Sequence, residues 1–239
     1  MPMSLQNFSA TVSDVQRLNQ KFLVVRAELV EPSRLEFSSG QYLILTVPGL
    51  EQKRSYSICS PAQTQHAVEI LIDTTPQGPG SLYTQNLQPG DALAFMAPAG
   101  SFILTDSALE QEPELVFVAT GSGISPIWSM IRDLLQSRGD TRPITLVWGL
   151  RSEQDIFWTE ELEELQRAFS NFTVHLTLSQ PSDEWPLCKG RVTACLTEHS
   201  FSLQAGYYLC GNGQMVEDVN TLLLEKGLSP DRIHREKFY

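Results

Sequence analysis

The first part of the chain alternates short apolar runs with turn residues. Five runs have the length and composition of β-strands, at residues 22–27, 41–47, 56–59, 68–73 and 92–96. Pro and Gly separate these runs, as at Pro48-Gly49 and Pro89-Gly90, and such residues punctuate strands with tight turns. One helical stretch, at residues 81–86, interrupts the series. Short strands at regular spacing predict a small all-β antiparallel barrel.

In the second part of the chain, apolar strands alternate with helices. Strands are expected at residues 115–119, 144–148, 172–178, 207–210 and 233–238, and helices at 127–136, 158–169, 192–198 and 215–226. Gly227 is placed to end the last helix. This alternation predicts an α/β domain with a parallel sheet. We expect two domains, a barrel over residues 1–107 and an α/β domain over residues 108–239.

Composition narrows the possible functions. No apolar run approaches the roughly 20 residues of a membrane span, and the first ten residues do not resemble a signal peptide. The net charge of −11 disfavours nucleic acid and anionic membranes as partners. The 4 cysteines and 4 histidines are scattered without metal-ligand spacing. We therefore expect no metal site, no disulfide framework and a cytoplasmic location.

A glycine-rich turn follows the strand at residues 115–119. It reads Gly121-x-Gly123, with Pro126 in the first turn of the next helix. Two glycines before a helix let the backbone approach a phosphate at the helix N-terminus. The dinucleotide fingerprint of three glycines is not met, because Pro126 stands where its third glycine would be. The motif by itself leaves a purely structural turn open.

Three more loops follow predicted strand ends. They are Gly149-Leu150-Arg151, Ser179-Gln180 and Gly211-Asn212-Gly213. Ligands of open α/β sheets bind beyond the carboxyl ends of the strands, so the four loops predict a nucleotide across one edge of the sheet. The stretch after Ser179 contains Asp183 and Glu184 and lacks a cation before Lys189. An acid suits a free ribose hydroxyl and repels a 2′-phosphate, which favours NADH over NADPH.

The predicted barrel carries two polar clusters. Arg54 and Tyr56 share one face of a strand by alternation, so a cation and an aromatic ring could address one ligand. Gly78-Pro79-Gly80-Ser81 precedes the short helix and could present N–H groups to a phosphate. Either cluster alone is more often structural.

Four motifs in order resemble the ferredoxin–NADP reductase superfamily: Arg54-x-Tyr56-Ser57, Gly78-x-x-Ser81, Gly121-x-Gly123-x-x-Pro126 and Leu209-Cys210-Gly211-Asn212-Gly213. The resemblance runs from about residue 7 to residue 239. It implies an all-β antiparallel flavin-binding barrel followed by an α/β nicotinamide-nucleotide-binding domain, with the active site where the two domains meet.

The resemblance also implies residue roles. Arg54 would hold the flavin pyrophosphate together with the helix start at Gly80, Ser81 and Leu82. Tyr56 would pack on the isoalloxazine, and Ser57 would hydrogen-bond toward its N5. Thr120 would lie between flavin and nicotinamide, with Cys210 near nicotinamide C4. The aromatic residue that covers the flavin would be Phe238 or Tyr239.

Two sets of candidate residues result. The candidate catalytic residues are Ser57, Cys210 and Glu236. The candidate cofactor-binding residues are Arg54, Tyr56, Ser57, Gly78, Gly80, Ser81, Leu82, Thr120, Gly121, Gly123, Pro126, Gly149, Arg151, Ser179, Asp183, Gly211, Asn212, Met215, Phe238 and Tyr239.

The resemblance implies an enzyme, an NAD(P)H-dependent flavoprotein reductase. It would pass a hydride from NAD(P)H to FAD and electrons onward to an acceptor such as a separate ferredoxin, flavodoxin or oxygenase component. Two alternatives stay open: a reductase of free flavin, and a subunit that only relays electrons or senses nucleotide. Because both Arg54 and the Gly78–Ser81 motif are present, held FAD is favoured over a transient flavin.

Overall fold

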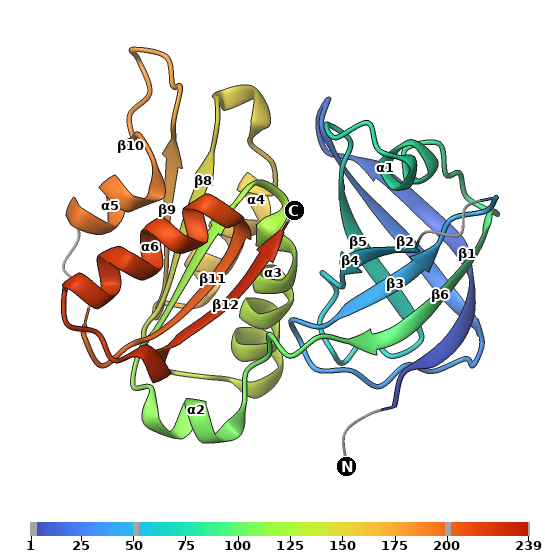
Figure 1. The fold of residues 1–239 in the computed structure, drawn as a ribbon, viewed down its shortest axis with the longest axis horizontal. Coiled ribbons are helices and arrows are strands. Elements are labelled where there is room, and N and C mark those ends of the chain that lie inside the picture. Colours follow the sequence, from blue (N-terminus) through green and yellow to red (C-terminus); the bar gives the residue numbers. More distant parts are fainter. Residues whose placement is uncertain (1–3, 50–52, 199–201, 239) are drawn as a thin grey trace. The chain divides into compact units, whose positions relative to one another are not determined.

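A computed structural model describes residues 4–49, 53–198 and 202–238 (Figure 1). Its contacts divide the chain into two units. The first contains the residues up to Ile103 together with Trp128–Arg138, and the second contains Leu104–Ile127 and the residues from Gly139 onward. The boundary expected between residues 107 and 108 stays a prediction.

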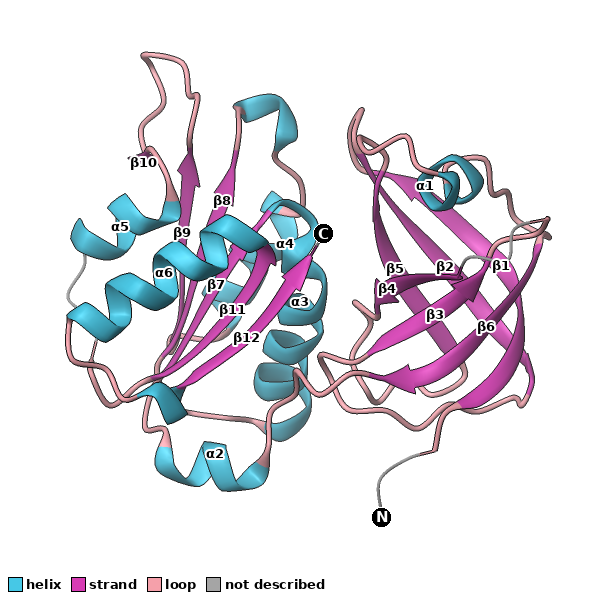
Figure 2. Ribbon diagram, in the orientation of Figure 1, coloured by secondary structure: helices cyan, strands magenta, loops and turns pink. Residues whose placement is uncertain are grey.

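The first unit is built on one antiparallel sheet of 6 strands in the order β4-β3-β6-β1-β2-β5 (Figure 2). The strands are β1 Gln6–Arg17, β2 Phe22–Glu31, β3 Tyr42–Thr46, β4 Lys53–Ser57, β5 Ala67–Asp73 and β6 Ala92–Ala99. Just after β4, Ile58 forms an antiparallel bridge with Ile70 of β5, which joins the two ends of the sheet. The result is a nearly closed barrel, so the predicted fold of this part is confirmed.

Two details of the barrel differ from the sequence expectation. The long strand β1 was not predicted. Phe8, Ala10 and Val12 point into the core, Ser9 and Thr11 between them are exposed, and most of the rest of the strand is exposed, so it contains no apolar run. Strand β4 begins at Lys53 and ends at Ser57, not at residues 56–59, because backbone pairing with β3 extends through its polar start. The helix α1, Pro79–Thr84, lies two residues earlier than expected.

The second unit contains a parallel sheet of 6 strands in the order β10-β9-β8-β7-β11-β12. The strands are β7 Leu115–Thr120, β8 Ile144–Leu150, β9 Phe172–Leu178, β10 Cys188–Lys189, β11 Gly206–Asn212 and β12 Ile233–Phe238. Each neighbouring pair runs parallel. This confirms the predicted α/β domain, although the two-residue strand β10 was not expected.

Among the described residues, three helices pack against this sheet: α4 Thr159–Ala168, α5 Val192–Glu198 and α6 Gly213–Glu225. Helix α2 Asp106–Gln111 also belongs to this unit, whereas α3 Ile124–Arg132 begins in it and continues into the first unit from Trp128 onward. Helices α5 and α6 bury Cys195, Val216 and Val219 against Val118 and Val147 of the sheet. Gly227 follows α6 with a φ of +88°, the left-handed conformation that ends a helix, as predicted.

The helix after the glycine-rich turn starts earlier than expected. A 3₁₀ turn, Gly121–Gly123, leads directly into α3, and a π-helical turn, Asp133–Arg138, follows it. The expected range of 127–136 was therefore too short at both ends. Helix α2 was not predicted; its N-cap is Thr105, whose hydroxyl accepts a hydrogen bond from Ala108 N. No helix among the described residues has the length and apolar character needed to cross a membrane.

Candidate cofactor sites

The two polar clusters of the barrel meet at Gly80. A Cβ at this residue would lie 2.7 Å from Arg54 Cγ and 2.9 Å from the Tyr56 hydroxyl. Contacts this short mean that a larger residue at position 80 would have to displace the Arg54 and Tyr56 side chains. The fold therefore packs the start of α1 directly on the face of β4 that carries Arg54 and Tyr56, although 24 residues separate Tyr56 from Gly80 in sequence.

The helix start has the conformation that a phosphate cradle needs. Gly78 is extended, Pro79 occupies the first helical turn, and the Ser81 hydroxyl donates to Gly78 O at 3.0 Å. A Cβ on Gly78 would have no described heavy atom within 4 Å, so this side of the turn is open. The Leu82 side chain is exposed. These features leave the first N–H groups of α1 accessible to an anion.

Strand β4 presents the remaining flavin candidates. Arg54 and Tyr56 are half-buried, and Ser57 is buried at the end of the strand. Burial raises the pKa of Tyr56, partly opposed by a hydrogen bond with Thr84 and by the positive charge of Arg54. Tyr56 is thus a neutral phenol whose hydroxyl lies at α1, beside Gly80 and Thr84.

The four loops of the second unit lie at the same edge of its sheet. In the parallel register Thr120 pairs with Gly149, Leu150 with Leu178, and Cys210 with Ala119. The loops that follow these strands therefore all begin at the same edge of the sheet. We call the loop residues 121–123, 151–152, 179–184 and 211–213 the coenzyme rim.

Hydrogen bonds tie the rim together. Asn212 N donates to Thr120 Oγ1 at 3.2 Å, and Gln180 N donates to Arg151 O at 2.7 Å. The Arg151 side chain crosses to the neighbouring loop, where its Nε donates to Gln180 Oε1 at 3.0 Å. The rim is therefore held by contacts between loops that are far apart in sequence.

The rim glycines have distinct roles. A Cβ on Gly123 would lie 2.4 Å from Cys210 O, and one on Gly211 would lie 2.4 Å from Thr120 Oγ1. These two glycines allow the 3₁₀ turn to pack on the end of β11. Gly121 differs, because it has a φ of +54° and its Cβ would meet no described atom within 4 Å. Of the two glycines in the motif, Gly121 is the one that faces open space.

Two further candidates, Gly149 at the end of β8 and Pro126 in α3, have packing roles. A Cβ on Gly149 would lie 2.7 Å from Val192 Cγ1 and 3.2 Å from Thr120 Cγ2, so this glycine lets α5 approach the end of β8. Pro126 is the third residue of α3 and lies in its first turn, where proline is tolerated.

Two candidate side chains at the start of α6, those of Asn212 and Met215, make contacts within the protein. Asn212 caps the helix, since its Oδ1 accepts from Gln214 N at 3.0 Å and from Met215 N at 3.3 Å. The Met215 side chain is buried in the core beneath α6. Their direct contribution to a ligand would therefore come from the backbone.

Cys210 and Glu236 lie next to each other on β11 and β12. Cys210 is fully buried, and burial together with the charge of Glu236 raises the pKa of its thiol well above the usual value. Glu236 Oε2 is buried and has no hydrogen-bond partner among the described residues. Burial raises the pKa of this carboxyl to about 7. Phe238 pairs with Asn212 at the end of β12, whereas Tyr239 lies outside the described residues.

The loop at residues 179–184 contains one contact that sequence reasoning missed. Glu153 Oε1 accepts a hydrogen bond from Ser182 N at 2.9 Å, which adds a carboxylate to the two acids of this loop. Hydrogen bonding to Ser182 lowers the pKa of Glu153. Lys189 Nζ donates to Asp183 O at 2.8 Å. Glu153 lies two residues after Arg151, so the sequence alone could have predicted that it lies near the rim.

Trp148 is a second residue that the sequence did not single out. Its Nε1 donates to Gly121 O at 3.2 Å, and its ring packs edge-on against Phe157 with centroids 4.7 Å apart. The buried Trp148 thereby holds the carbonyl group of Gly121 in place. The sequence showed an apolar strand residue here but not the direction of its indole N–H.

Two family profiles match the two units. The oxidoreductase FAD-binding domain family matches residues 9–103, and the oxidoreductase NAD-binding domain family matches residues 117–221. The chain belongs to the ferredoxin–NADP reductase superfamily. The resemblance seen in the four motifs is confirmed, and the matched families support the predicted cofactors FAD and NAD(P)H.

Relatives within the superfamily include reductase components of oxygenases. The chain is 31% identical over 98% of its length to the reductase component of propane 2-monooxygenase from Rhodococcus jostii, and 33% identical over 98% to that of phenol 2-monooxygenase from Pseudomonas sp. strain CF600. It spans 64% and 66% of these two proteins.

Solved structures of the superfamily have the same fold. The cytochrome P450 reductase GcoB from Amycolatopsis superposes with a TM-score of 0.89 at 28% identity, covering 98% of this chain and 70% of that one. A ferredoxin NADP⁺ reductase from Neisseria gonorrhoeae with bound FAD and NADP superposes with a TM-score of 0.81 at 19% identity, covering 99% and 100%.

Proposed function

We propose that this protein is an FAD-dependent oxidoreductase that takes a hydride from NADH and passes electrons to a separate acceptor. The observation that carries the proposal is the assembly of each cofactor motif set within its own unit. Arg54, Tyr56 and Gly80 meet in the barrel, and the four strand-end loops meet at the coenzyme rim. Bound FAD would supply the chemistry, since a flavin accepts a hydride and releases electrons singly.

The residues of the barrel would bind and orient the flavin. The Arg54 guanidinium offers paired donors to a pyrophosphate, and the first turn of α1 adds backbone N–H groups. The Tyr56 ring would pack on the flavin, with its hydroxyl anchored to Thr84. The buried Ser57 hydroxyl would hydrogen-bond toward the reacting nitrogen.

The residues of the rim would bind and orient the nicotinamide nucleotide. Gly121 leaves space for a phosphate beside the 3₁₀ turn, and Thr120 and Cys210 would border the nicotinamide ring. Glu236 would hold a proton at its buried Oε2 over part of the physiological pH range, because its pKa is near 7. Ser179 and Asp183 would contact the adenosine ribose.

We propose NADH as the preferred coenzyme and an oxygenase component, ferredoxin or flavodoxin as the acceptor. Asp183 and Glu184 of the rim, together with Glu153, which accepts a hydrogen bond from Ser182 N, support NADH, since acids disfavour a 2′-phosphate. The acceptor class is supported by the relatives, which are reductase components of oxygenases. All 4 cysteines are free, which supports a reducing cytoplasm as the location.

The decisive experiment combines flavin analysis with anaerobic stopped-flow reduction. We expect yellow protein with about one FAD per chain, released on heating, and rapid bleaching by NADH followed by reoxidation with an added one-electron acceptor. Colourless protein that reduces added free flavin would replace this function with that of a flavin reductase. Flavin that is bound but not reduced by NADH or NADPH would indicate a subunit without coenzyme turnover.

A further inference from the structure

Two cysteines with no part in the cofactor sites lie side by side in the second unit. Cys188 begins β10 and Cys195 lies in α5, and their Sγ atoms are 3.4 Å apart. The thiol of Cys195 donates a hydrogen bond to Cys188 Sγ. The two sulfurs therefore already face each other across the turn between strand and helix.

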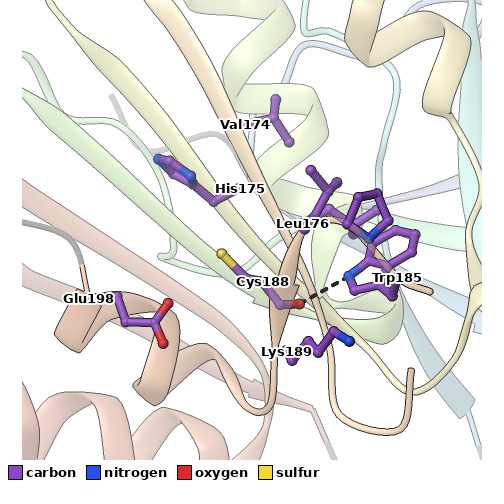
Figure 3. Close-up of a pocket in the computed structure, with 9 residues that line it drawn as sticks. Val174, His175, Leu176, Trp185, Cys188, Lys189 and Glu198 are labelled. Atoms are coloured by element: carbon purple, nitrogen blue, oxygen red, sulfur yellow. Dashed lines mark hydrogen bonds between the residues drawn. The ribbon is translucent and has the colours of Figure 1, made fainter. Parts of the chain in front are cut away.

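The two thiols differ in their access to solvent. Cys188 is half-buried and lines an open groove of about 580 Å³. Figure 3 shows it there with His175 of β9, Trp185 and Glu198 of α5. Cys195 is buried, with 1% of its surface exposed. A small oxidant arriving from solvent would reach Cys188 first.

The buried Cys195 thiol keeps its proton at neutral pH. Burial, and then the hydrogen bond and charge of Cys188, raise the pKa of Cys195 to about 12. Cys195 is thus a thiol at neutral pH, and Cys188 is the sulfur that accepts its hydrogen bond. The reaction would begin at Cys188, with Cys195 as the resolving thiol.

Bond formation needs little movement. A disulfide has its sulfurs about 2.05 Å apart, so the pair must close by about 1.4 Å. Strand β10 is only 2 residues long and lies at the edge of the sheet. It is followed by Gly190, whose φ of +105° marks a sharp turn that can absorb a small shift.

We propose that Cys188 and Cys195 form an oxidisable thiol pair that a peroxide converts into an intramolecular disulfide. The Cys188 thiol attacks one peroxide oxygen, the O–O bond breaks, and the Cys188 proton joins the departing hydroxide, so that a sulfenic acid and one water form. The Cys195 sulfur then attacks the Cys188 sulfur. The S–S bond forms, the S–O bond breaks, and the hydroxyl leaves with the Cys195 proton as a second water. Two thiols lose two electrons in total, and hydrogen peroxide gains them.

The disulfide would tie β10 to α5 beside the coenzyme rim. Gly190 N donates to Leu178 O at 2.7 Å, and Thr177 Oγ1 donates to Gly190 O at 3.0 Å. The loop between β9 and β10 carries Ser179 and Asp183. Oxidation is therefore expected to slow hydrogen exchange in residues 179–191 relative to the reduced protein.

The test uses the whole protein as purified, treated with stoichiometric hydrogen peroxide. Thiols are then alkylated in denaturant and the intact mass is measured. We expect two of the 4 free thiols to disappear, the unalkylated mass to fall by about 2 Da, and peptide mapping to link Cys188 to Cys195. A dithiol reductant should restore all of them.

Matched variants complete the test. Cys188→Ser and Cys195→Ser should each form no internal disulfide, whereas Cys59→Ala, which removes a buried barrel cysteine, should still form it. Oxygen addition at Cys188 with a free Cys195 would overturn the proposal, as would a disulfide between two chains or one involving Cys59 or Cys210. If a variant fails to fold, the peptide map of the wild-type protein decides alone.

Discussion

Cys210 of β11 lies beside Glu236 of β12 in the parallel register of the sheet. The pairing places a buried carboxylate oxygen, which has no hydrogen-bond partner in the described part of the chain, next to a fully buried thiol. Both groups favour their neutral forms: burial raises the pKa of Glu236, and burial together with the charge of Glu236 raises the pKa of Cys210. Glu236 therefore contributes to the pH dependence of the protein's stability.

We expect Glu236→Gln to stabilise the protein above neutral pH. The folded pKa of Glu236 is raised from 4.5 to about 7. The folded state therefore binds an extra proton between these values, and stability falls as pH rises through that window. Glutamine removes the charge, so its advantage should grow from about zero at pH 4 to about 2 kcal/mol at pH 8, after a discount for residual exposure. Thermal melts across this range measure it.

The control for this prediction is Glu217→Gln. Glu217 is exposed, and its ion pair with Lys237 lowers its pKa. Its contribution has the opposite sign, because it is present above the unfolded pKa and is lost on acidification. Equal melting curves for wild type and Glu236→Gln at pH 8 would contradict the burial argument.

Arg54→Ala should lose FAD during purification. The substitution removes paired donors to the pyrophosphate and loosens the contact with Gly80. Absorbance at 450 nm after gel filtration measures the loss. Lys53→Ala, an exposed neighbour on the same strand, is the control and should keep its flavin. Full yellow colour in Arg54→Ala would remove Arg54 from the flavin site.

Cys210→Ala should keep normal FAD content but slow flavin reduction by at least about tenfold, because a misplaced nicotinamide ring loses alignment with the flavin. Anaerobic stopped-flow reduction by NADH measures the rate. Cys59→Ala, a buried cysteine of the barrel, should leave the rate unchanged. Reduction at the wild-type rate would make Cys210 a packing residue.

The wild-type protein should have a higher kcat/KM for NADH than for NADPH. The rim carries Asp183, and Glu153 outside it binds the rim residue Ser182; both acids lie where the ribose is expected. The Arg151 side chain is hydrogen-bonded to Gln180. Gln180→Arg should raise kcat/KM for NADPH, because it adds a cation and releases the Arg151 side chain. Steady-state assays at low salt compare the coenzymes. A preference for NADPH in the wild type would implicate Arg151, Lys189 or Arg191 as the phosphate ligand.

Tyr208→Phe should destabilise the second unit without affecting flavin content. The Tyr208 hydroxyl donates to Glu112 Oε2 at 2.9 Å, and His234 Nε2 lies 2.7 Å from Glu112 Oε1. Removing the hydroxyl leaves a buried carboxylate oxygen underpaired, which costs about 1–3 kcal/mol. Urea denaturation measures it, with Tyr83→Phe on the barrel as a control. An unchanged midpoint would show that water replaces the lost donor.

The sequence determined the class of each unit and the order of its elements. Strand length, helical period and turn residues are properties of short windows, so residues 172–178 and 192–198 were placed at their observed bounds. The rim also followed from sequence, since parallel strands must end at one edge. Strand β1 was missed because only 3 of its 12 residues are buried, so it contains no continuous apolar run.

Only the tertiary structure decided which distant residues touch. Gly80 against Arg54, Gly123 against Cys210, and Cys195 against Cys188 are contacts between separate elements. No local pattern encodes them, because they depend on strand register and on how each helix packs on its sheet. The same holds for Glu236, whose sequence context is polar and whose raised pKa arises only from burial beside β11.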